Sequence, residues 1–505
     1  MIGIDSGTTS IKAVVMDLCG NEIYKKDFKL TAICPRQDMF EEDMREIWQK
    51  ACMALRDVAA KFERESIIGI GITAQGDGLW LVDEAGEPVR NGCCFCDGRA
   101  AEFVDEWVES GACDRLFMRT GTRIFTGNQN GIVRWMERYE PESLEKARYI
   151  LHLKDYLFFK LTGEITTDAT DQSLVLLDPN TRTYDRQAFE ICGIERYREK
   201  YPPVRSAREN AFPIRTELAE ALGLNPDILV TSGPMDVSAC ALGSGVVEPG
   251  DCCSIMGTAA LHEMVIDRPL SDDIRAGMTV AHVMEGRWLR LMASLAGTPN
   301  LEWAIDTLGG DLRQRARTRG ASVYQLVEEM ISQVPIGANG VMYHPYLLAG
   351  GERAPFTDPR ARASYTNINV THTTADILRA TYEGVALAML DCYSHMPRQP
   401  KKITVCGGGA NSAFWCQMFA DVLGVEIVTV KGEELGARGV VFNNAVVQGI
   451  YPDHRAAVER NVVVGQRYQP NMKNHEQYAR LYPLYQEICR ALAPSWKLRQ
   501  QTLGQ

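Results

Sequence analysis

The chain has 505 residues, of which 45% are hydrophobic and 24% are charged, and its net charge is -11 at pH 7. This composition is typical of a globular protein and excludes a disordered or fibrous chain. The acidic balance argues against nucleic-acid binding driven by the phosphate backbone. Because a single hydrophobic core stops growing at about 250 to 300 residues, we expect two large domains, 1–243 and 244–505.

The fifteen cysteines are scattered and lie mostly in apolar runs, which favours buried thiols over disulfides or a zinc site. No run reaches the roughly 18 apolar residues of a membrane span. Met1 is followed directly by a predicted strand rather than by a targeting segment. We therefore expect a cytoplasmic protein that binds neither a membrane nor nucleic acid.

The first predicted element is an antiparallel meander formed by MIGID, IKAVVMD and IYKKDFKL, which are separated by glycine turns. Asp5 ends the first strand, and Gly7, Thr8 and Thr9 follow it, with Lys12 just beyond. Backbone N–H groups and hydroxyls in such a turn can hold phosphate oxygens and the water shell of a metal. Taken alone, the same residues would also suit an ordinary hairpin turn.

A helix is predicted over 41–63 and a buried strand over 66–73. With the three antiparallel strands, these elements make the start of a ribonuclease-H-like layout. Next come a polar loop, a predicted hairpin over 79–89 and a second polar loop. Open sheets present binding clefts after their strands, so the polar residues of both loops suggest a site for a hydroxylated ligand. They are Gln75, Gly76, Asp77, Phe95, Asp97 and Arg99.

The middle of the chain carries two strand-and-loop units in succession. The strand DILVTSG leads into a turn that holds Asp236, and a carboxylate there can accept a proton from a bound hydroxyl. The strand CCSIM ends on Gly257 and Thr258, which can bind a phosphate. In isolation an Asx turn and ordinary turn residues would explain both places. The rest of the chain favours the functional interpretation.

The second half repeats the plan loosely, with strands followed by Gly297 and a helix from Pro299. Later, a strand over 403–405 leads into a glycine loop and an amphipathic helix that runs to Leu423. A glycine loop that opens a helix turns free N–H groups toward a ligand, usually a nucleotide or a phosphate. A dinucleotide fingerprint is excluded, because Ser412 stands where the third glycine would be.

Across nearly its whole length the chain resembles the FGGY carbohydrate kinases. The pieces that carry the resemblance come in the order of that family: DSGTTSIKAVVMD, MFEEDMREIW, AQGDG, DGRA, KDYLFFKLTGE with TTD, GPMD, MGT, GGGANSAFWCQMFADVLG and EELGARGV. The resemblance implies an α/β fold of two actin-like, ribonuclease-H-like domains, with a nucleotide and substrate cleft between them. It also implies ATP and Mg²⁺ as cofactors.

The resemblance assigns roles to individual residues of this sequence. Asp236 corresponds to the catalytic base, and Asp5 and Asp236 to the carboxylates on the metal side. The expected substrate contacts are Gln75, Gly76, Asp77, Phe95, Asp97 and Asp236. The expected nucleotide contacts are Thr8, Thr9, Lys12, Gly257, Thr258, Gly297, Gly408, Gly409, Ala410 and Asn411.

Departures from the family pattern narrow the range of expected substrates. Gly76 and Asp77 stand where glycerol kinases carry an arginine and a glutamate, and the Met-His pair of xylulose kinases is absent. AQGDG, YHPY and GERAPF are closest to erythritol kinases, with L-xylulose kinases second. Arg438 replaces a small residue of the family.

We therefore expect phosphorylation of a small neutral polyol, with erythritol first and L-xylulose or another pentulose as the alternative. An actin-like ATPase and a non-catalytic sugar sensor are the less favoured readings. The expected partners are the small polyol or sugar substrate and a second copy of the chain in a homodimer.

Overall fold

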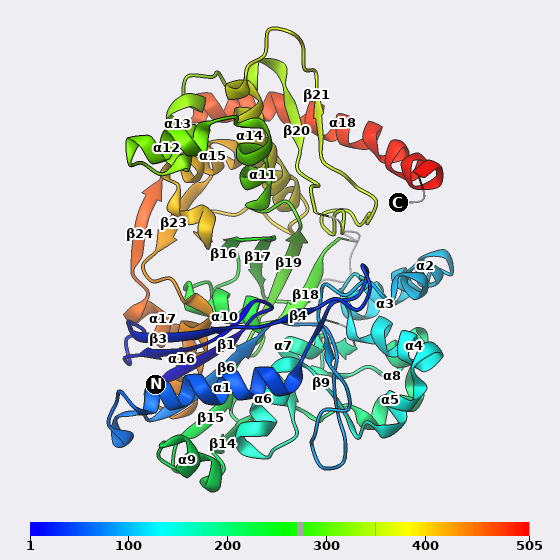
Figure 1. The fold of residues 1–505 in the computed structure, drawn as a ribbon, viewed down its shortest axis with the longest axis vertical. Coiled ribbons are helices and arrows are strands. Elements are labelled where there is room, and N and C mark those ends of the chain that lie inside the picture. The colour runs from blue at the N-terminus through cyan, green and yellow to red at the C-terminus, as the bar shows by residue number, and fades with distance from the viewer. Residues whose placement is uncertain (175, 270–275, 349, 504–505) are drawn as a thin grey trace. The chain divides into compact units, whose positions relative to one another are not determined.

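The computed structural model describes residues 1–174, 176–269, 276–348 and 350–503 (Figure 1). These residues divide into two compact units. The first contains 1–249, 265–290 and 432–463, and the second contains 250–264, 291–431 and 464–505. Within the described ranges, no helix is long and apolar enough to cross a membrane.

The first unit is built on a six-stranded sheet in the order β14-β15-β6-β1-β2-β3. The bounds are β1 Ile2–Ser6, β2 Ser10–Met16, β3 Glu22–Lys29, β6 Gly69–Ala74, β14 Ala211–Pro213 and β15 Leu229–Ser232. β1, β2 and β3 form the predicted antiparallel meander, and β6 and β15 run parallel to β1. The start of the chain therefore has the predicted layout.

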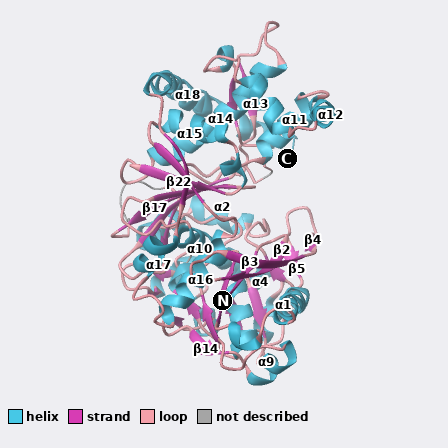
Figure 2. Ribbon diagram, turned by 90° about the vertical axis from the view of Figure 1, so that its left-hand side faces the viewer, coloured by secondary structure: helices cyan, strands magenta, loops and turns pink. Residues whose placement is uncertain are grey.

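Helices cover both faces of this sheet. On one side lie α1 (Met44–Ala59) and α6 (Leu153–Thr162), whose apolar residues share a core with Ile11 and Ala13 of β2. On the other side lie α16 (Leu435–Val447) and α17 (His454–Asn461), which share a core with Val14 and Met16. Successive residues of β2 thus serve opposite cores, as the alternation along a strand requires. Figure 2 shows α1 and α16 on the two sides of the strands of this sheet.

α16 lies directly on glycines of the sheet. A Cβ atom on Gly3 would stand 2.8 Å from the Cβ of Ala437, and one on Gly71 would stand 2.6 Å from the carbonyl oxygen of Val440. Any larger residue in these strands would push the helix away. Glycine therefore sets how closely α16 approaches β1 and β6.

The long middle segment of the first unit is mostly helical, as predicted. Its helices are α2 Ala101–Glu109, α3 Ala112–Thr120, α4 Gln129–Tyr139, α5 Pro141–Lys146, α7 Ala169–Gln172, α8 Arg186–Cys192 and α9 Thr216–Leu222. The predicted hairpin over 79–89 is present in a short form. The main strand partner of β7 (Trp80–Val82) is β9 (Tyr149–Leu151). The second arm of the hairpin returns antiparallel with one bridge, between Val82 and Pro88, and the N–H of Asp83 donates to the carbonyl oxygen of Glu87 at 2.9 Å. Proline has no N–H to continue a ladder there.

The second unit repeats the strand pattern of the first. β17 (Ala260–Ile266) is antiparallel to β16 (Cys252–Met256), and β22 (Lys402–Cys406) and β23 (Glu426–Val430) continue in parallel. β24 (Val464–Tyr468) closes this edge antiparallel. β18 (Met278–Ala281) and β19 (Trp288–Ser294) complete the seven-stranded sheet. β16 thus takes the place that β1 has in the first sheet.

The helices of the second unit include the predicted helix from Pro299 and the predicted helix that ends at Leu423. They are α11 Pro299–Leu308, α12 Leu312–Arg319, α13 Val323–Ile331, α14 Thr374–Ser394, α15 Ala413–Leu423 and α18 Met472–Leu503. Ser412 caps α15, because its hydroxyl accepts a hydrogen bond from the N–H of Trp415 at 2.9 Å. The cap explains why a serine follows the glycine loop.

Candidate active site

Three parallel strands of the first unit end at the same edge of their sheet. β1 and β6 pair in register from Ile2 with Ile70 to Ser6 with Ala74, and β15 pairs with β6 up to Ser232. The chain leaves these strands at Asp5 and Ser6, at Gln75, and at the turn before α10 (Asp236–Gly243). Parallel strands therefore bring residues far apart in the sequence to one edge.

Asp236 is the first residue of α10, where the helix dipole favours a carboxylate. Its Oδ1 accepts a hydrogen bond from the N–H of Val237 at 2.8 Å. Burial and, to a smaller extent, the negative charges of Asp5, Asp171 and Asp77 together raise the pKa of Asp236 to about 7, although the bond from Val237 lowers it. A carboxyl with a pKa near neutrality can exchange a proton with a ligand at physiological pH.

Asp5 lies at the end of β1, opposite Lys12 of β2. Burial raises the pKa of Asp5 to about 6, although Lys12 lowers it. The Lys12 ammonium donates to Glu434 Oε2 at 2.9 Å, and Lys25 donates to the other oxygen of Glu434 at the same distance. Glu434 therefore holds the lysine beside Asp5.

The turn after Asp5 carries the predicted phosphate-binding hydroxyls. Gly7 closes the turn by donating its N–H to the carbonyl oxygen of Ser10 at 3.1 Å. Thr9 is exposed and Thr8 is half-buried. Both hydroxyls thus remain within reach of solvent.

The loop after β6 holds the predicted substrate residues Gln75, Gly76 and Asp77. The Gln75 amide donates to Glu42 Oε2 at 2.8 Å, and burial raises the pKa of Glu42 to about 7. Asp77 has a left-handed backbone with φ of 58°, and its Oδ1 accepts from the Asn128 amide. An aspartate held in this strained conformation is oriented by the surrounding structure.

Asp97 makes contacts of a different kind. Its carboxylate is fully buried and accepts from the N–H of Phe40 at 2.8 Å and from Arg99 Nε at 2.8 Å and Nη2 at 2.9 Å. Arg99 also pairs with Glu41 at 2.6 Å. Phe95, two residues earlier, is half-buried. The role of Phe95 and Asp97 as substrate contacts stays a prediction, and the bonds of Asp97 brace the loop from within.

In the second unit, β16 and β22 are neighbouring parallel strands, so the Gly257-Thr258 turn and the glycine loop after Cys406 leave the same edge. Gly297 packs against the first turn, since a Cβ atom there would lie 2.3 Å from the carbonyl oxygen of Thr258. Thr298 donates its N–H and its hydroxyl to the carbonyl oxygen of Gly257, at 2.8 and 2.9 Å. The turn is thereby fixed from behind.

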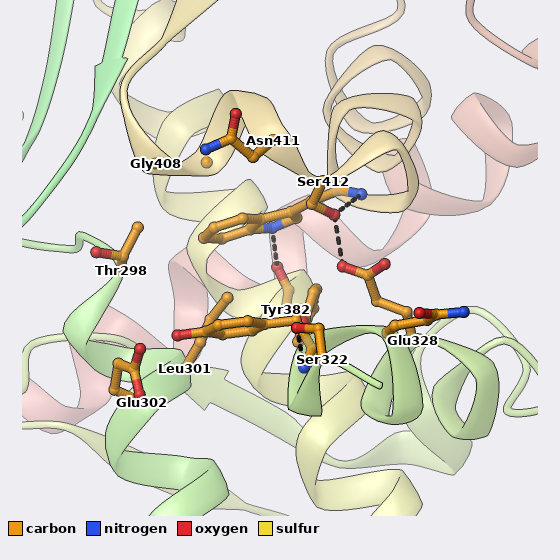
Figure 3. Close-up of a pocket in the computed structure, with 13 residues that line it drawn as sticks. Thr298, Leu301, Glu302, Ser322, Glu328, Tyr382, Gly408, Asn411 and Ser412 are labelled. Carbon is orange, nitrogen blue, oxygen red and sulfur yellow. Dashed lines mark hydrogen bonds between the residues drawn. The ribbon is translucent and has the colours of Figure 1, made fainter. Parts of the chain in front are cut away.

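A cavity of about 520 Å³ opens beside the glycine loop (Figure 3). Gly408, Gly409 and Asn411 line it together with residues of α11, α13, α14 and α15, whereas Ala410 does not. The Ser412 hydroxyl donates to Glu328 Oε1 at 2.6 Å, and the Trp415 indole donates to the carbonyl oxygen of Tyr382 at 3.4 Å. The size of the cavity and its aromatic and polar lining suit a flat heterocycle.

Sequence reasoning missed Glu42, Glu434 and the cluster around Lys154 in the first unit. Glu42, Glu434, Lys154 and Asp168 lie in stretches that carry the family resemblance, namely MFEEDM, EELGARGV, KDYL and TTD. The Lys154 ammonium pairs with Asp168, with Asp171 at 3.1 Å and with Asp155 at 3.4 Å. Arg438 is also buried, and its Nε donates to the carbonyl oxygen of Gly243 at 2.7 Å, which joins α16 to the end of α10.

Comparison with known proteins agrees with this arrangement. Solved sugar kinases share the two-domain fold: the ligand-bound xylulose kinase from Lactobacillus acidophilus superposes with a TM-score of 0.91 at 25% identity, over 98% of this chain and 99% of that one. Models of the N-terminal and C-terminal domains of the FGGY family of carbohydrate kinases match residues 1–243 and 252–447. The protein therefore belongs to the FGGY family of carbohydrate kinases and is a sugar kinase.

Two curated relatives illustrate the range of substrates. An erythritol kinase of Brucella abortus is 30% identical over 98% of this chain and 97% of its own length. An L-xylulose/3-keto-L-gulonate kinase of Escherichia coli is 27% identical over 97% of both chains.

The electrostatic link between Asp5 and Asp236 is testable in metal-free protein. Asp5→Asn removes a like charge and should lower the pKa of Asp236 below about 7, while burial should keep it above the ordinary value of 3.8. Carboxyl ¹³C resonances of aspartate-labelled protein, titrated in the presence of a chelator, would measure the shift. Asp27→Asn, an exposed change on β3, should leave the pKa unaltered. An unshifted or higher pKa in Asp5→Asn would contradict the coupling.

Proposed function

We propose that this protein transfers the terminal phosphoryl group of ATP to a hydroxyl of a small neutral polyol, with erythritol as the preferred acceptor. The observation that carries the proposal is the buried Asp236 carboxyl, whose pKa is about 7. Asp236 takes the proton of the acceptor hydroxyl while the oxygen of that hydroxyl bonds to the terminal phosphorus. The bond from that phosphorus to the ADP oxygen breaks, and ADP leaves. Positioning and charge neutralisation supply most of the catalysis in such transfers.

The two parts of the chain would divide this work. Residues 1–243 would bind the acceptor and carry the first phosphate loop, with Thr8, Thr9 and Lys12. Residues 244–505 would bind the nucleotide, with the phosphates at Gly257, Thr258 and Gly297 and the adenosine at the loop of Gly408, Gly409, Ala410 and Asn411. The cavity beside that loop supports the second assignment.

Magnesium fits the carboxylates at the edge of the first sheet. Asp5 raises the pKa of Asp236, and a divalent cation would relieve this repulsion. Among the described residues, no three His, Cys, Asp or Glu side chains form a metal cage. Magnesium commonly binds through one or two carboxylates together with waters and substrate phosphates, so Asp5 and Asp236 suffice. Bound there, it would neutralise phosphate charge.

A neutral acceptor suits the charges near Asp236. Gln75 and Asp77 would accept hydrogen bonds from hydroxyls, whereas an anionic sugar acid would be repelled by the carboxylates. L-Xylulose or another pentulose is the second candidate, because the relative from Escherichia coli is named for such a substrate. A sugar sensor would have no use for a base at Asp236, and an actin-like ATPase would have no use for an acceptor loop with Gln75 and Asp77. ATP consumption that requires an added polyol would separate these alternatives.

Asp236→Asn should lower turnover at least about a hundredfold and leave nucleotide binding nearly unchanged, since a general base supplies roughly 10² to 10⁴-fold. Coupled ADP release and calorimetric titration of ATP would measure the two effects. Turnover above a tenth of the wild-type value would refute the role of Asp236.

Across a panel of tetritols, pentitols, pentuloses, glycerol and gluconate, we expect the highest kcat/KM for erythritol, or otherwise for L-xylulose. Asp77→Ala should lose saturation with the acceptor and keep the KM for ATP, because it removes an acceptor contact and alters none of the proposed nucleotide contacts. Steady-state kinetics in both substrates would measure this. If gluconate or glycerol is the best substrate, or if Asp77→Ala changes nothing, the proposed pocket is wrong.

Gly297→Ala should raise the KM for ATP at least about tenfold, because the added methyl group would overlap the Thr258 carbonyl and displace the phosphate turn. Acceptor binding in the absence of ATP, measured by calorimetry, is the internal control and should be preserved. An unaltered KM for ATP would argue against a phosphate at this turn.

A further inference from the structure

A buried polar cluster lies beside the Asp236 turn and is not used by the proposed chemistry. It consists of His152, Lys154, Asp155, Asp168 and Asp171, all buried. Three carboxylates face one lysine and one histidine, so the negative groups outnumber the cations. Lys154 also donates to the Ser232 hydroxyl at 3.0 Å, which ties the cluster to the end of β15.

The carboxylates of this cluster are not equally engaged. Asp168 accepts from Lys154 and caps α7 by accepting from the N–H of Thr170 at 2.7 Å. Asp155 Oδ1 faces Lys154, and its Oδ2 accepts from the N–H of His152 at 3.2 Å. Asp171 faces Lys154 with Oδ2 only, and its Oδ1 is buried without a hydrogen-bond partner among the described residues. Asp171 therefore has acceptor capacity to spare.

The spare oxygen of Asp171 points at the predicted acceptor loop. A Cβ atom on Gly76 would lie 3.7 Å from Asp171 Oδ1. The N–H of Met235, directly before Asp236, donates to the Thr170 hydroxyl at 2.9 Å, which fixes α7 against the turn of the base. Asp171 thus lies beside the loop of Gly76, and its negative charge raises the pKa of Asp236.

His152 is a second member of this cluster with a polar atom that lacks a partner among the residues that the structure describes. Its ring is buried, and Nδ1 faces the Gln172 amide at 3.2 Å and Asp155 at 3.6 Å. Its Nε2 has no hydrogen-bond partner within the described part of the chain. Burial lowers the pKa of this ring, but the negative charges around it, including those of Asp171 and Asp77, raise the pKa above its ordinary value. A buried donor and a buried acceptor without partners cost free energy, and ligand groups that bond to them would recover it.

We propose that Asp171 Oδ1 and His152 Nε2 bind one hydroxyl of the acceptor, away from the hydroxyl that is phosphorylated. A hydroxyl is both a donor and an acceptor, so it satisfies the carboxylate oxygen and the imidazole N–H together. This inference rests on the proposed function, because it assigns a further part of the same acceptor site.

A purely structural cluster would account for Lys154 with Asp168 and Asp155 alone. It does not account for an additional carboxylate whose second oxygen is turned away from Lys154 toward Gly76. A carboxylate that serves only to balance a buried lysine is expected to use both oxygens internally, as Asp155 does.

The experiment compares the penalty for deleting each hydroxyl of the acceptor in the wild-type protein and in Asp171→Ala. The acceptor is the best neutral substrate of the panel, and its singly deoxygenated analogues provide the deletions. In the wild type, one non-reacting position should cost at least about thirtyfold in kcat/KM. In Asp171→Ala that penalty should fall to within about threefold, and the penalties at the other positions should persist. His152→Gln should reduce the penalty for deleting the hydroxyl at the same position.

Asp155→Asn is the matched control, since it alters the same Lys154 cluster without facing Gly76. Its pattern of penalties should equal that of the wild type, whatever its effect on overall rate or stability. If Asp171→Ala does not fold, Asp171→Asn replaces it. That variant should reduce the same penalty at least threefold, because a neutral amide accepts a weaker bond than a carboxylate. An unchanged pattern, or equal changes at all positions, would overturn the inference.

The proposed function and this inference fail in different ways. If the panel shows no phosphorylation, the proposed function is refuted, and the comparison is made by calorimetric binding of the same compounds without ATP. A position-specific loss in Asp171→Ala would then still support the binding role. Absence of binding to every polyol and ketose would overturn both.

Discussion

The parallel register of β1, β6 and β15 is the constraint on which the candidate site of the first unit depends. It places Asp5, the loop of Gln75 and Asp77, and Asp236 at one edge, although the sequence separates the first and last of them by more than 200 residues. Burial raises the pKa of Asp236, and the negative charges of neighbouring carboxyls add to this rise, so that the pKa reaches about 7. A carboxyl that titrates near neutral pH follows from burial and strand geometry together.

Sequence patterns predicted the elements and loops that depend on local signals. Apolar runs followed by Gly-Thr or Gly-Gly predicted three strand-and-turn units, and the structure has β1, β16 and β22 there. Pairings between distant positions could not be predicted, because no local pattern encodes them. Lys12 donates a hydrogen bond to Glu434, which lies 422 positions later in the sequence. Lys154 forms ion pairs with Asp168 and Asp171 in the next segment. The hairpin over 79–89 follows a local turn signal and is present in a short form, whereas the distant strand Tyr149–Leu151, with which Trp80–Val82 pairs, could not be predicted.

Asp77 and Asp97 looked alike in the sequence, because each carboxylate follows a strand in a glycine loop. The structure distinguishes them by what surrounds the carboxylate. Both oxygens of Asp97 are taken by Arg99 and Phe40, and removing such a group would leave the buried guanidinium of Arg99 short of a partner. Asp77 is instead held in a left-handed backbone. Neighbours of this kind decide whether a polar loop residue braces the fold or faces a ligand.

The glycine contacts beneath α16 also bear on how the chain is made. β1 and β6 emerge early in synthesis, yet the helix that covers their glycines, Leu435–Val447, emerges only after the whole second sheet up to β23. Until then one apolar face of the first sheet has no permanent cover, since Val14 and Met16 belong to the core that α16 completes. The nascent first unit is thus held incomplete on the ribosome while the second unit is translated, which exposes it to aggregation or to chaperone capture for that interval.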